Sequence, residues 1–245
     1  MHCIFQIKYR LRFLTIVLLV NFTFLNHVNG QPSLTNKYGL LVVKNQKVFQ
    51  EEIRQDSNKQ MVNLIKVIPG LVLDLKYATK DNFMHQKLYP FVHTTFLRKP
   101  AADSLKKIVE ELKKQHLAVK IFDAYRPYSI TEKMWEKVKD DRYAADPSKG
   151  SGHNRGAAVD LTLIDLNSKI ELPMGTGFDN FNDTAHIDFT DLPKDVLDNR
   201  NLLRKIMEKY GFIQLTTEWW HYYLPNSCSF ELLDLSFFDL RKRLH

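Results

Sequence analysis

The chain has 245 residues, of which 44% are hydrophobic and 12% aromatic. This is enough to bury one sizeable core but not several, so one globular domain is predicted. The formal net charge is +7, but basic and acidic residues alternate and form no clustered basic stripe, so a nucleic-acid partner is not expected.

The first thirty residues are typical of a secretory signal peptide. Three basic residues between positions 8 and 12 precede an apolar run that begins at Phe13, and small residues stand before Gln31. Cleavage near Gln31 predicts an exported protein, periplasmic or extracellular. An uncleaved membrane anchor is the alternative, but Asn21 and Asn26 interrupt the run, which is short for a membrane span.

Cleavage would change both the charge and the thiol content of the chain. It removes three basic residues and no acidic one, which leaves a net charge of +4, and it removes Cys3. Cys228 would then be the remaining cysteine, so no intrachain disulfide is expected despite export. No stable membrane insertion is expected after cleavage, and the oligomeric state is left open.

The next two segments differ in their patterning. Residues 31–60 are polar and poorly patterned, which predicts an amino-terminal extension that precedes a single domain at 61–245. From Met61 to Leu75 the chain becomes apolar around Pro69 and Gly70, which predicts a turn between short strands.

The middle of the chain alternates helical and extended patterns. Apolar residues at helical spacing after Pro100 predict a helix, and 117–122 reads as a strand. Ser129 and Glu132 have the spacing of a capping box, which predicts a helix through about Val138. The polar stretch 140–152 is predicted to form a rim over a cleft.

The last third predicts a strand at 156–164, a helix at 199–210 closed by Gly211, and a final strand at about 212–223. Strands and helices follow one another without strict βαβ alternation. This favours an α+β fold, with a small, mainly antiparallel sheet flanked by helices. The metal site described next would lie on the sheet and its loops.

Four residues form the parts of a catalytic zinc site. His153 and Asp160 stand in SGHNRGAAVD, and Glu218 and His221 in EWWH. Two neutral imidazoles and one carboxylate leave a tetrahedral zinc ion with one position for water, and a nearby carboxylate can take the proton of that water. A salt bridge to an internal arginine is the alternative reading of Asp160, because a carboxylate in an apolar strand needs a partner.

The spacing of Glu218 and His221 constrains the local backbone. Residues three apart in an ideal strand point to opposite faces of the sheet. The chain must therefore twist, bulge or only begin its strand between them. His221 would be the direct ligand, and Glu218 the general base that later protonates the leaving amine.

Arg126 follows an apolar strand in the sequence DAYRP. A fixed guanidinium there could stabilise the negative oxygen that develops when a carbonyl is attacked. The alternative, an ordinary strand-end arginine paired with Asp123, is equally consistent with the sequence.

Between Val72 and Tyr223 the chain resembles the zinc-dependent D-alanyl-D-alanine dipeptidases of the VanX type. The broader group of zinc peptidases is indicated by SGHNRGAAVD and EWWH, and the dipeptidases by DLKYATKDNF, DAYRP, KGSGHNRG and MGTGFD in the same order. The resemblance implies hydrolysis of free D-alanyl-D-alanine in cell-wall peptide metabolism, with one zinc ion per chain.

The resemblance also assigns residues. It implies His153, Asp160 and His221 as zinc ligands, Glu218 as the catalytic base and Arg126 as the transition-state arginine. The substrate's amino end would be held by Asp179 and Tyr77, and Ser151 would line the same small pocket.

Two other functions remain open from the sequence. One is a D,D-carboxypeptidase or endopeptidase that acts on longer peptidoglycan peptides with the same chemistry. The other is a non-catalytic module with a structural zinc, which would need a fourth protein ligand. Cys228, His186 and Asp188 are the candidates for that ligand, although the presence of Glu218 argues against this function.

Overall fold

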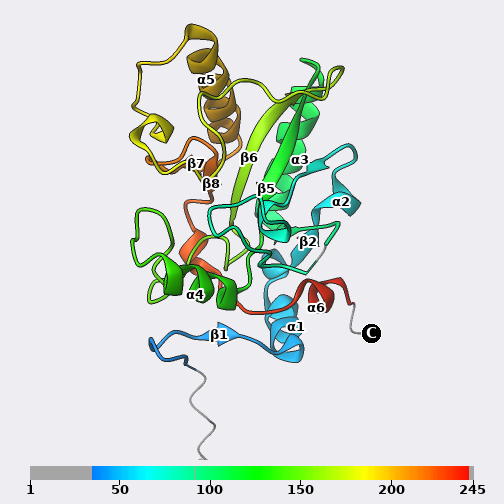
Figure 1. Cartoon of the computed structure of the whole chain (residues 1–245). Helices are drawn as coiled ribbons and strands as arrows, with labels where there is room; N and C mark the ends of the chain where they lie inside the picture. Colours follow the sequence, from blue (N-terminus) through cyan, green and yellow to red (C-terminus); the bar gives the residue numbers. More distant parts are fainter. Residues whose placement is uncertain (1–34, 91, 243–245) are drawn as a thin grey trace, which may run out of the picture. The chain divides into compact units, whose positions relative to one another are not determined.

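The computed structural model describes residues 35–90 and 92–242, so the predicted signal peptide lies outside the described residues. The helices in this part are α1 (Gln46–Gln55), α2 (Leu64–Val67), α3 (Lys99–Lys113), α4 (Tyr128–Lys137), α5 (Lys194–Lys209) and α6 (Phe237–Arg241) (Figure 1). The strands are β1 (Val42–Val43), β2 (Met61–Asn63), β3 (Val72–Leu73), β4 (Phe96–Arg98), β5 (Leu117–Asp123), β6 (Ala158–Asp165), β7 (Ile213–Gln214), β8 (His221–Tyr223) and β9 (Leu232–Leu233).

The predicted α+β fold is confirmed. Its main sheet has the strand order β3-β5-β6-β8-β7. Only β3 runs parallel to its neighbour, whereas the other pairs are antiparallel. Two small pairs accompany the sheet: β2 with β4, and β1 with β9.

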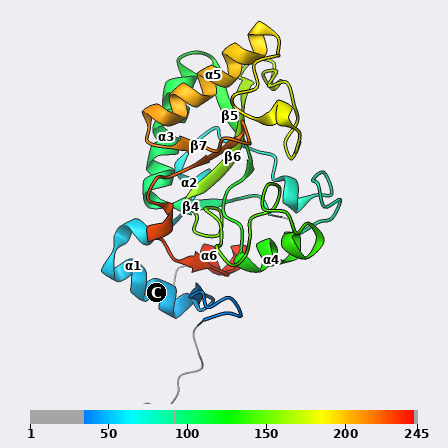
Figure 2. The same cartoon turned by 90° about the vertical axis from the view of Figure 1, so that its left-hand side faces the viewer.

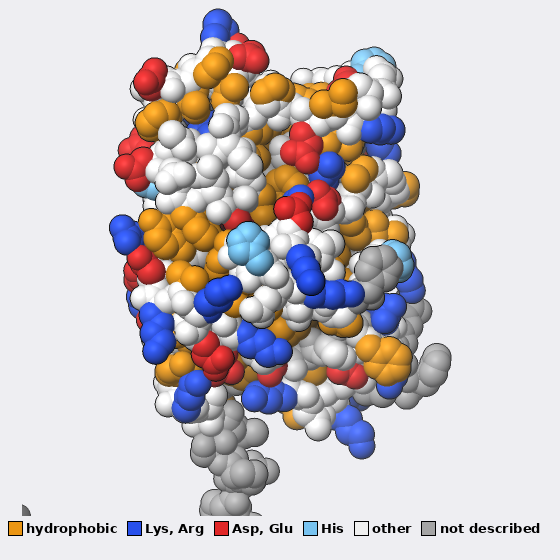
Figure 3. Space-filling view, viewed as in Figure 1, with side chains coloured by type: hydrophobic (Ala, Val, Ile, Leu, Met, Phe, Trp, Pro, Cys, Tyr) orange, Lys and Arg blue, Asp and Glu red, His pale blue; other side chains and the backbone are white. Residues whose placement is uncertain are grey.

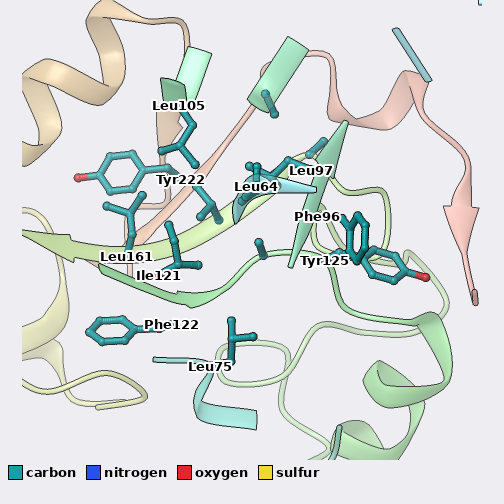
Figure 4. Packing of buried hydrophobic residues seen from close by; sticks show 14 of the residues in the cluster. Leu64, Leu75, Phe96, Leu97, Leu105, Ile121, Phe122, Tyr125, Leu161 and Tyr222 are labelled. Atoms are coloured by element: carbon teal, nitrogen blue, oxygen red, sulfur yellow. The ribbon is translucent and has the colours of Figure 1, made fainter. Parts of the chain in front are cut away.

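Both faces of the sheet are covered. α3 and α5 lie on one side, and loops lie on the other (Figure 2). Leu161 and Ile121 point to the helix side with Leu105 of α3, whereas Phe122 and Leu75 pack on the opposite side (Figure 4). The central strands β5 and β6 are therefore almost fully buried, which explains their continuous apolar pattern.

The helices at α3 and α5 follow the predicted periodicity. In α3, Pro100 occupies the first turn, and Leu105, Ile108 and Leu112 are buried along one stripe. α5 begins at Lys194, five residues earlier than predicted, and Gly211 follows its end at a φ of +88°. The added residues include Val196, which is buried.

The predicted capping box of α4 is wrong. The side chain of Ser129 makes no cap, because the helix already begins at Tyr128 after Pro127. The backbone N–H of Ser129 donates instead to Asp234 Oδ1 at 2.9 Å. A carboxylate 105 residues away in the sequence therefore caps the first turn of this helix.

The segment at 61–75 contains a helical turn that the sequence pattern did not predict. Asn63 ends β2, and its side chain caps α2 by accepting from Lys66 N–H. The predicted turn at Pro69 and Gly70 is present, with Gly70 at a φ of +85°, and leads into β3.

The described part of the amino-terminal extension is packed into the fold rather than lying loosely on it. β1 pairs with β9 near the carboxyl end, in the register Val42 with Leu232. In α1, Phe49 is only 2% exposed and lies 5.4 Å from the buried guanidinium of Arg98. Figure 1 shows α1 beside α6 at the lower end of the molecule.

The surface agrees with the charge pattern of the sequence. On the face seen in Figure 3, basic and acidic side chains are interspersed. Across residues 35–90 and 92–242, none of the helices combines the length and apolar character that crossing a membrane requires.

Candidate metal centre and substrate cavity

Two aspartates and one histidine lie in a row across three neighbouring strands of the main sheet. In the register of the strands, Asp123 of β5 lies opposite Asp160 of β6, and Asp160 lies opposite His221 of β8. The register of β5 shifts between Ile121 and Asp123, and this irregularity brings Asp123 into the row. Directly opposed residues have Cβ atoms about 4.5–5.5 Å apart, so the sheet itself brings these groups together.

His153 reaches the row from the turn that precedes β6. Gly156, at a φ of +66°, lets the chain bend back, and its N–H donates to the carbonyl of His153 at 3.0 Å. The imidazole Nδ1 lies 2.7 Å from the carbonyl oxygen of Ala124, so it must carry the proton and donate. This fixes the tautomer and leaves the lone pair of Nε2 directed at the cluster.

The three predicted ligands form one group. His153 Nε2 lies 3.3 Å from His221 Nδ1 and 3.3 Å from Asp160 Oδ2, and His221 Nδ1 lies 2.9 Å from Asp160 Oδ1. Ligand atoms about 2.0–2.1 Å from a tetrahedral zinc ion lie about 3.3 Å from one another. The spacing of this group therefore fits a metal ion at its centre.

A buried orphan oxygen supports the same interpretation. Asp160 Oδ1 is buried and has no hydrogen-bonding partner, although an imidazole nitrogen lies 2.9 Å away. Leaving such an oxygen unsatisfied in a protein interior is costly. A cation that both atoms face removes this cost, so the buried His153, Asp160 and His221 group could hold a metal.

Glu218 stands beside this group without belonging to it. β8 begins only at His221, so Glu218 lies in the preceding turn, and the two side chains can meet. The carboxylate Oε2 lies 3.7 Å from His221 Nδ1. Burial raises the pKa of Glu218 to about 7, and the negative charge of Asp160 adds to the rise against the opposing effect of His221.

Arg126 has both of the surroundings that the sequence left open. Its Nε and Nη2 lie 3.0 and 2.9 Å from Asp123 Oδ2, so it forms the ion pair with Asp123 that was the alternative to a catalytic role. Its Nη2 also lies 4.0 Å from Asp160 Oδ2, and its guanidinium stacks on Tyr77 at 4.8 Å from the ring centre. It therefore lies at the metal group in a fixed orientation.

Two of the three predicted substrate residues meet each other. The Tyr77 hydroxyl donates to Asp179 Oδ1 at 3.0 Å, and Phe83 N–H is 3.3 Å from Asp179 Oδ2. Burial raises the pKa of Asp179 to about 7, although both hydrogen bonds oppose the rise. Asp179 also has a φ of +58°, a strained value for a residue other than glycine.

Ser151 is placed differently. It does not line the cavity over the site, and its Oγ accepts from Asn154 N–H at 3.2 Å. Asn154 is fully buried and donates to the carbonyl of Arg126 and to Thr131 Oγ1. Asn154, which no sequence pattern marked as a site residue, therefore ties the turn of His153 to the arginine.

A cavity of about 330 Å³ opens over the site. It brings together all the predicted site residues except Ser151, and adds aromatic and charged residues from the loops at 140–145 and near 181. Its lining residues are Tyr77, Phe83, Arg126, Asp141, Arg142, Tyr143, Ala145, His153, Asp160, Asp179, Phe181, Leu215, Thr217, Glu218, Trp220 and His221. The stretch 140–152 thus contributes to a rim, as predicted. A larger hollow of about 420 Å³ beside α1 and α6 contains none of the predicted site residues.

The candidates for a fourth ligand lie elsewhere. Within the described part of the chain, the group that could hold a metal consists of three residues and includes none of Cys228, His186 and Asp188. Cys228 is exposed, and His186 lies 3.9 Å from Asp183 on the surface. None of these three candidates is therefore placed to act as a fourth ligand beside His153, Asp160 and His221.

Comparisons with known proteins agree with this chemistry. A family model of peptidase M15, described as D-ala-D-ala dipeptidase, matches residues 57–243. A protein from Escherichia coli (strain K12) named D-alanyl-D-alanine dipeptidase is 37% identical over 174 residues, which cover 71% of this chain and 89% of that protein. A protein of the same name from Enterococcus faecium is 31% identical over 188 residues. This match covers 67% of this chain and 93% of that protein.

One solved structure is also similar. A chain from a structure titled for the LdcB LD-carboxypeptidase and peptidoglycan recognition is 20% identical, with a TM-score of 0.37. The match covers 58% of this chain and 67% of that chain. A likeness this weak bears neither on the fold nor on the function.

Proposed function

The chain belongs to the peptidase M15 family of D-alanyl-D-alanine dipeptidases, and from this premise we propose how its own residues bind and hydrolyse that dipeptide. It is a metallo-dipeptidase that acts on D-alanyl-D-alanine. The observation that carries the mechanism is the gathering of His153, Asp160 and His221 beside Glu218 in one small cavity.

The metal proposed is one zinc ion per chain, held by His153 Nε2, Asp160 and His221 Nδ1. Two imidazoles and a carboxylate are a ligand set that zinc accepts in catalytic sites, and the spacing of the ligand atoms suits its bond lengths. Bound zinc supplies Lewis acidity, which lowers the pKa of water to about 7 and polarises a carbonyl group.

Glu218 is proposed as the general base and acid. Its carboxylate lies within 3.7 Å of the ligand nitrogen of His221, on the cavity wall. It takes a proton from the attacking water and returns it to the nitrogen of the leaving D-alanine. A pKa raised to about 7 by burial suits a group that must both accept and give a proton near neutral pH.

Arg126 and Asp179 are proposed to act on two different charges. One is the negative charge that develops during the reaction, and the other is the positive charge at the amino end of the substrate. Arg126, fixed by Asp123 and Tyr77, would stabilise the negative charge that develops on the carbonyl oxygen. Asp179, with Tyr77, would bind the ammonium of the dipeptide, which places the peptide bond at the metal. The contact of Ser151 with the backbone supports a role in shaping the turn of His153.

The size of the cavity favours a free dipeptide over the longer peptides of the alternative function. A volume of about 330 Å³ lies at the small end of ligand pockets, which span about 300–1,000 Å³. Asp179 inside the cavity offers a charge to a free ammonium. A longer peptide has an amide at that position and would leave the carboxylate unpaired.

The activity is tested by product analysis. The purified protein is offered D-alanyl-D-alanine, L-alanyl-L-alanine and a pentapeptide that ends in D-alanyl-D-alanine, with and without a chelator, and products are identified by mass spectrometry. We expect rapid release of D-alanine from the free D,D-dipeptide, and loss of this activity with the chelator until zinc is restored. Preferred cleavage of the pentapeptide would overturn the assignment in favour of the carboxypeptidase.

Export is a separate proposal. It is supported by the basic and apolar pattern of residues 1–30 and by the small residues before Gln31. An exported enzyme would meet dipeptides released from peptidoglycan rather than a cytosolic precursor pool. Cell fractionation with amino-terminal sequencing tests this. A mature protein found only in the cytosol, with residues 1–30 intact, would contradict it.

A further inference from the structure

One charge of the substrate has no partner in the proposed function. The ammonium of a free dipeptide is assigned to Asp179, but the carboxylate of the second residue also enters the cavity. An ionised carboxylate that leaves water needs a cation or several donors, because burying it unpaired is costly. A second specificity-determining residue is therefore required on the opposite side of the peptide bond.

Two guanidinium groups line the cavity, and no lysine does so among the described residues. Arg126 is buried, and its Nε and Nη2 are engaged by Asp123 beside the metal group. Arg142 differs, because its side chain is 69% exposed and its charge lies at the rim. Of the two, Arg142 is the one that can meet a group entering from solvent.

The place of Arg142 matches the direction in which the carboxylate must lie. Arg142 lines the substrate cavity and also an adjoining hollow of about 120 Å³, and both contain Thr217 and Glu218. Asp179 lines only the first. Glu218 protonates the leaving amine, and the carboxylate is attached one carbon away from that amine. The carboxylate therefore lies on the side of Glu218, where Arg142 stands.

The present partner of Arg142 is readily exchanged. Its Nε donates to Asp140 Oδ1 at 2.9 Å and its Nη2 donates to Asp140 Oδ2 at 2.6 Å. A carboxylate of the substrate can make the same two hydrogen bonds. An ion pair on the surface contributes little to stability, so replacing one carboxylate by another costs little.

Aromatic contacts keep the arginine at the mouth of the cavity. Its guanidinium carbon lies 5.1 Å from the centre of the Tyr143 ring. Tyr143 packs on Phe181 at 4.7 Å, and Phe181 packs on Phe83 at 5.3 Å. Phe83 donates its N–H toward Asp179, so this row of rings connects the two charged ends of the site.

We propose that Arg142 binds the terminal carboxylate of the dipeptide by exchanging Asp140 for it. This inference rests on the proposed function. It makes the enzyme selective for substrates with a free carboxyl end, in addition to the free amino end recognised by Asp179.

The experiment compares D-alanyl-D-alanine with its carboxamide, which has the same shape but no terminal charge. The holoenzyme and the variant Arg142→Gln are assayed on both. We expect the variant to lose about threefold to fivefold in kcat/KM on the acid, mainly through a higher KM, because an ion pair at the exposed rim of the cavity is removed. On the carboxamide the two proteins should agree within about twofold.

Lys149→Gln is the matched control, because it removes an exposed cation of the same loop that does not line the cavity. It should keep the full preference for the acid. An equal loss on both substrates in Arg142→Gln, no loss on either, or the same loss of preference in Lys149→Gln would each overturn the inference. If the unmodified enzyme cleaves neither substrate, it is the proposed function that fails.

Discussion

Asp123 and Arg126 form a buried pair in which one carboxylate oxygen, Oδ2, meets both Nε and Nη2 of the guanidinium, at 3.0 and 2.9 Å. Asp123 is fully buried, and its other oxygen accepts from the Tyr89 hydroxyl at 2.9 Å. The pair therefore does more than neutralise charge. It fixes the direction in which Arg126 faces Asp160 and the cavity.

Replacing Asp123 by Asn should reduce turnover without removing the metal. The amide keeps the shape but not the charge, so Arg126 loses its anchor, and we expect kcat to fall about tenfold or more. Zinc content should stay near one per chain, because His153 Nδ1 donates to Ala124 and not to Asp123. Steady-state kinetics and metal analysis of the same sample measure both quantities.

Tyr89→Phe is the control for this variant. It removes a neutral hydrogen bond to the same carboxylate and leaves the ion pair in place. The fall in kcat should be several times smaller in Tyr89→Phe than in Asp123→Asn. If Asp123→Asn keeps the turnover of the unmodified enzyme, then fixing Arg126 has no part in catalysis.

Glu218→Gln and His153→Ala should separate chemistry from metal binding. Glu218 is not one of the three ligands, so its variant should retain zinc and lose about 10²-fold or more in kcat, as expected when a general base is removed. His153→Ala removes a ligand and should lower the zinc content itself. Dialysis against a graded series of chelator concentrations compares their affinities. A fully active Glu218→Gln would exclude the proposed base.

The sequence predicted the parts that local patterns or short motifs determine. The apolar stripe of α3 and the continuous apolar run of β5 were visible because each depends on its own periodicity. His153, Asp160 and His221 were recognised through their two motifs, and the structure brings them together. The strand that starts only at His221 was one of the alternatives that the spacing allowed.

What the sequence did not predict depends on contacts between distant residues. The cap of α4 comes from Asp234, which no local pattern near Ser129 can indicate. The packing of the extension depends on the pairing of β1 with β9, the latter near the carboxyl end of the chain. Arg142 stands in a polar loop whose composition is that of any exposed loop, and only the cavity gives it a role.

Phe49→Ala should show that the extension stabilises the enzyme. Phe49 is buried on the guanidinium of Arg98, which in turn donates to the carbonyl of Arg155 beside the turn of His153. Truncating a buried phenylalanine costs about 3–5 kcal/mol. In a domain of this size a loss of about 3 kcal/mol lowers Tm by about 6–12 °C, which calorimetry measures.

Val48→Ala is the matched control on the same helix. Val48 is 49% exposed, and its truncation should change Tm by no more than about 2 °C. Equal Tm values for the Phe49 and Val48 variants would show that the extension contributes nothing to the stability of the domain.

Asp179 should make substrate binding depend on pH. Burial raises the pKa of its carboxyl to about 7, so Asp179 becomes ionised as pH rises from 6 to 7.5. The ammonium of the dipeptide remains largely protonated over this range, since its pKa is about 8. KM should therefore fall with rising pH in the unmodified enzyme. In Asp179→Asn it should be higher and independent of pH, and a parallel fall in the variant would assign the pH dependence to another group.

The same carboxyl should cost stability when it ionises. The pKa of Asp179 is 3.8 in an unperturbed chain and about 7 in the folded one, so the folded chain binds this proton more tightly. The free energy of unfolding therefore decreases as pH rises from about 4 to about 7.

Asp179→Asn avoids this loss and also suits the φ of +58°, which asparagine tolerates better than most residues. In chelator-treated protein, which removes the effect of the metal on this charge, the variant should have the higher Tm at pH 8 and a clearly smaller advantage at pH 5. Calorimetry at both values tests this, and an advantage of the same size at pH 5 would attribute it to the backbone alone.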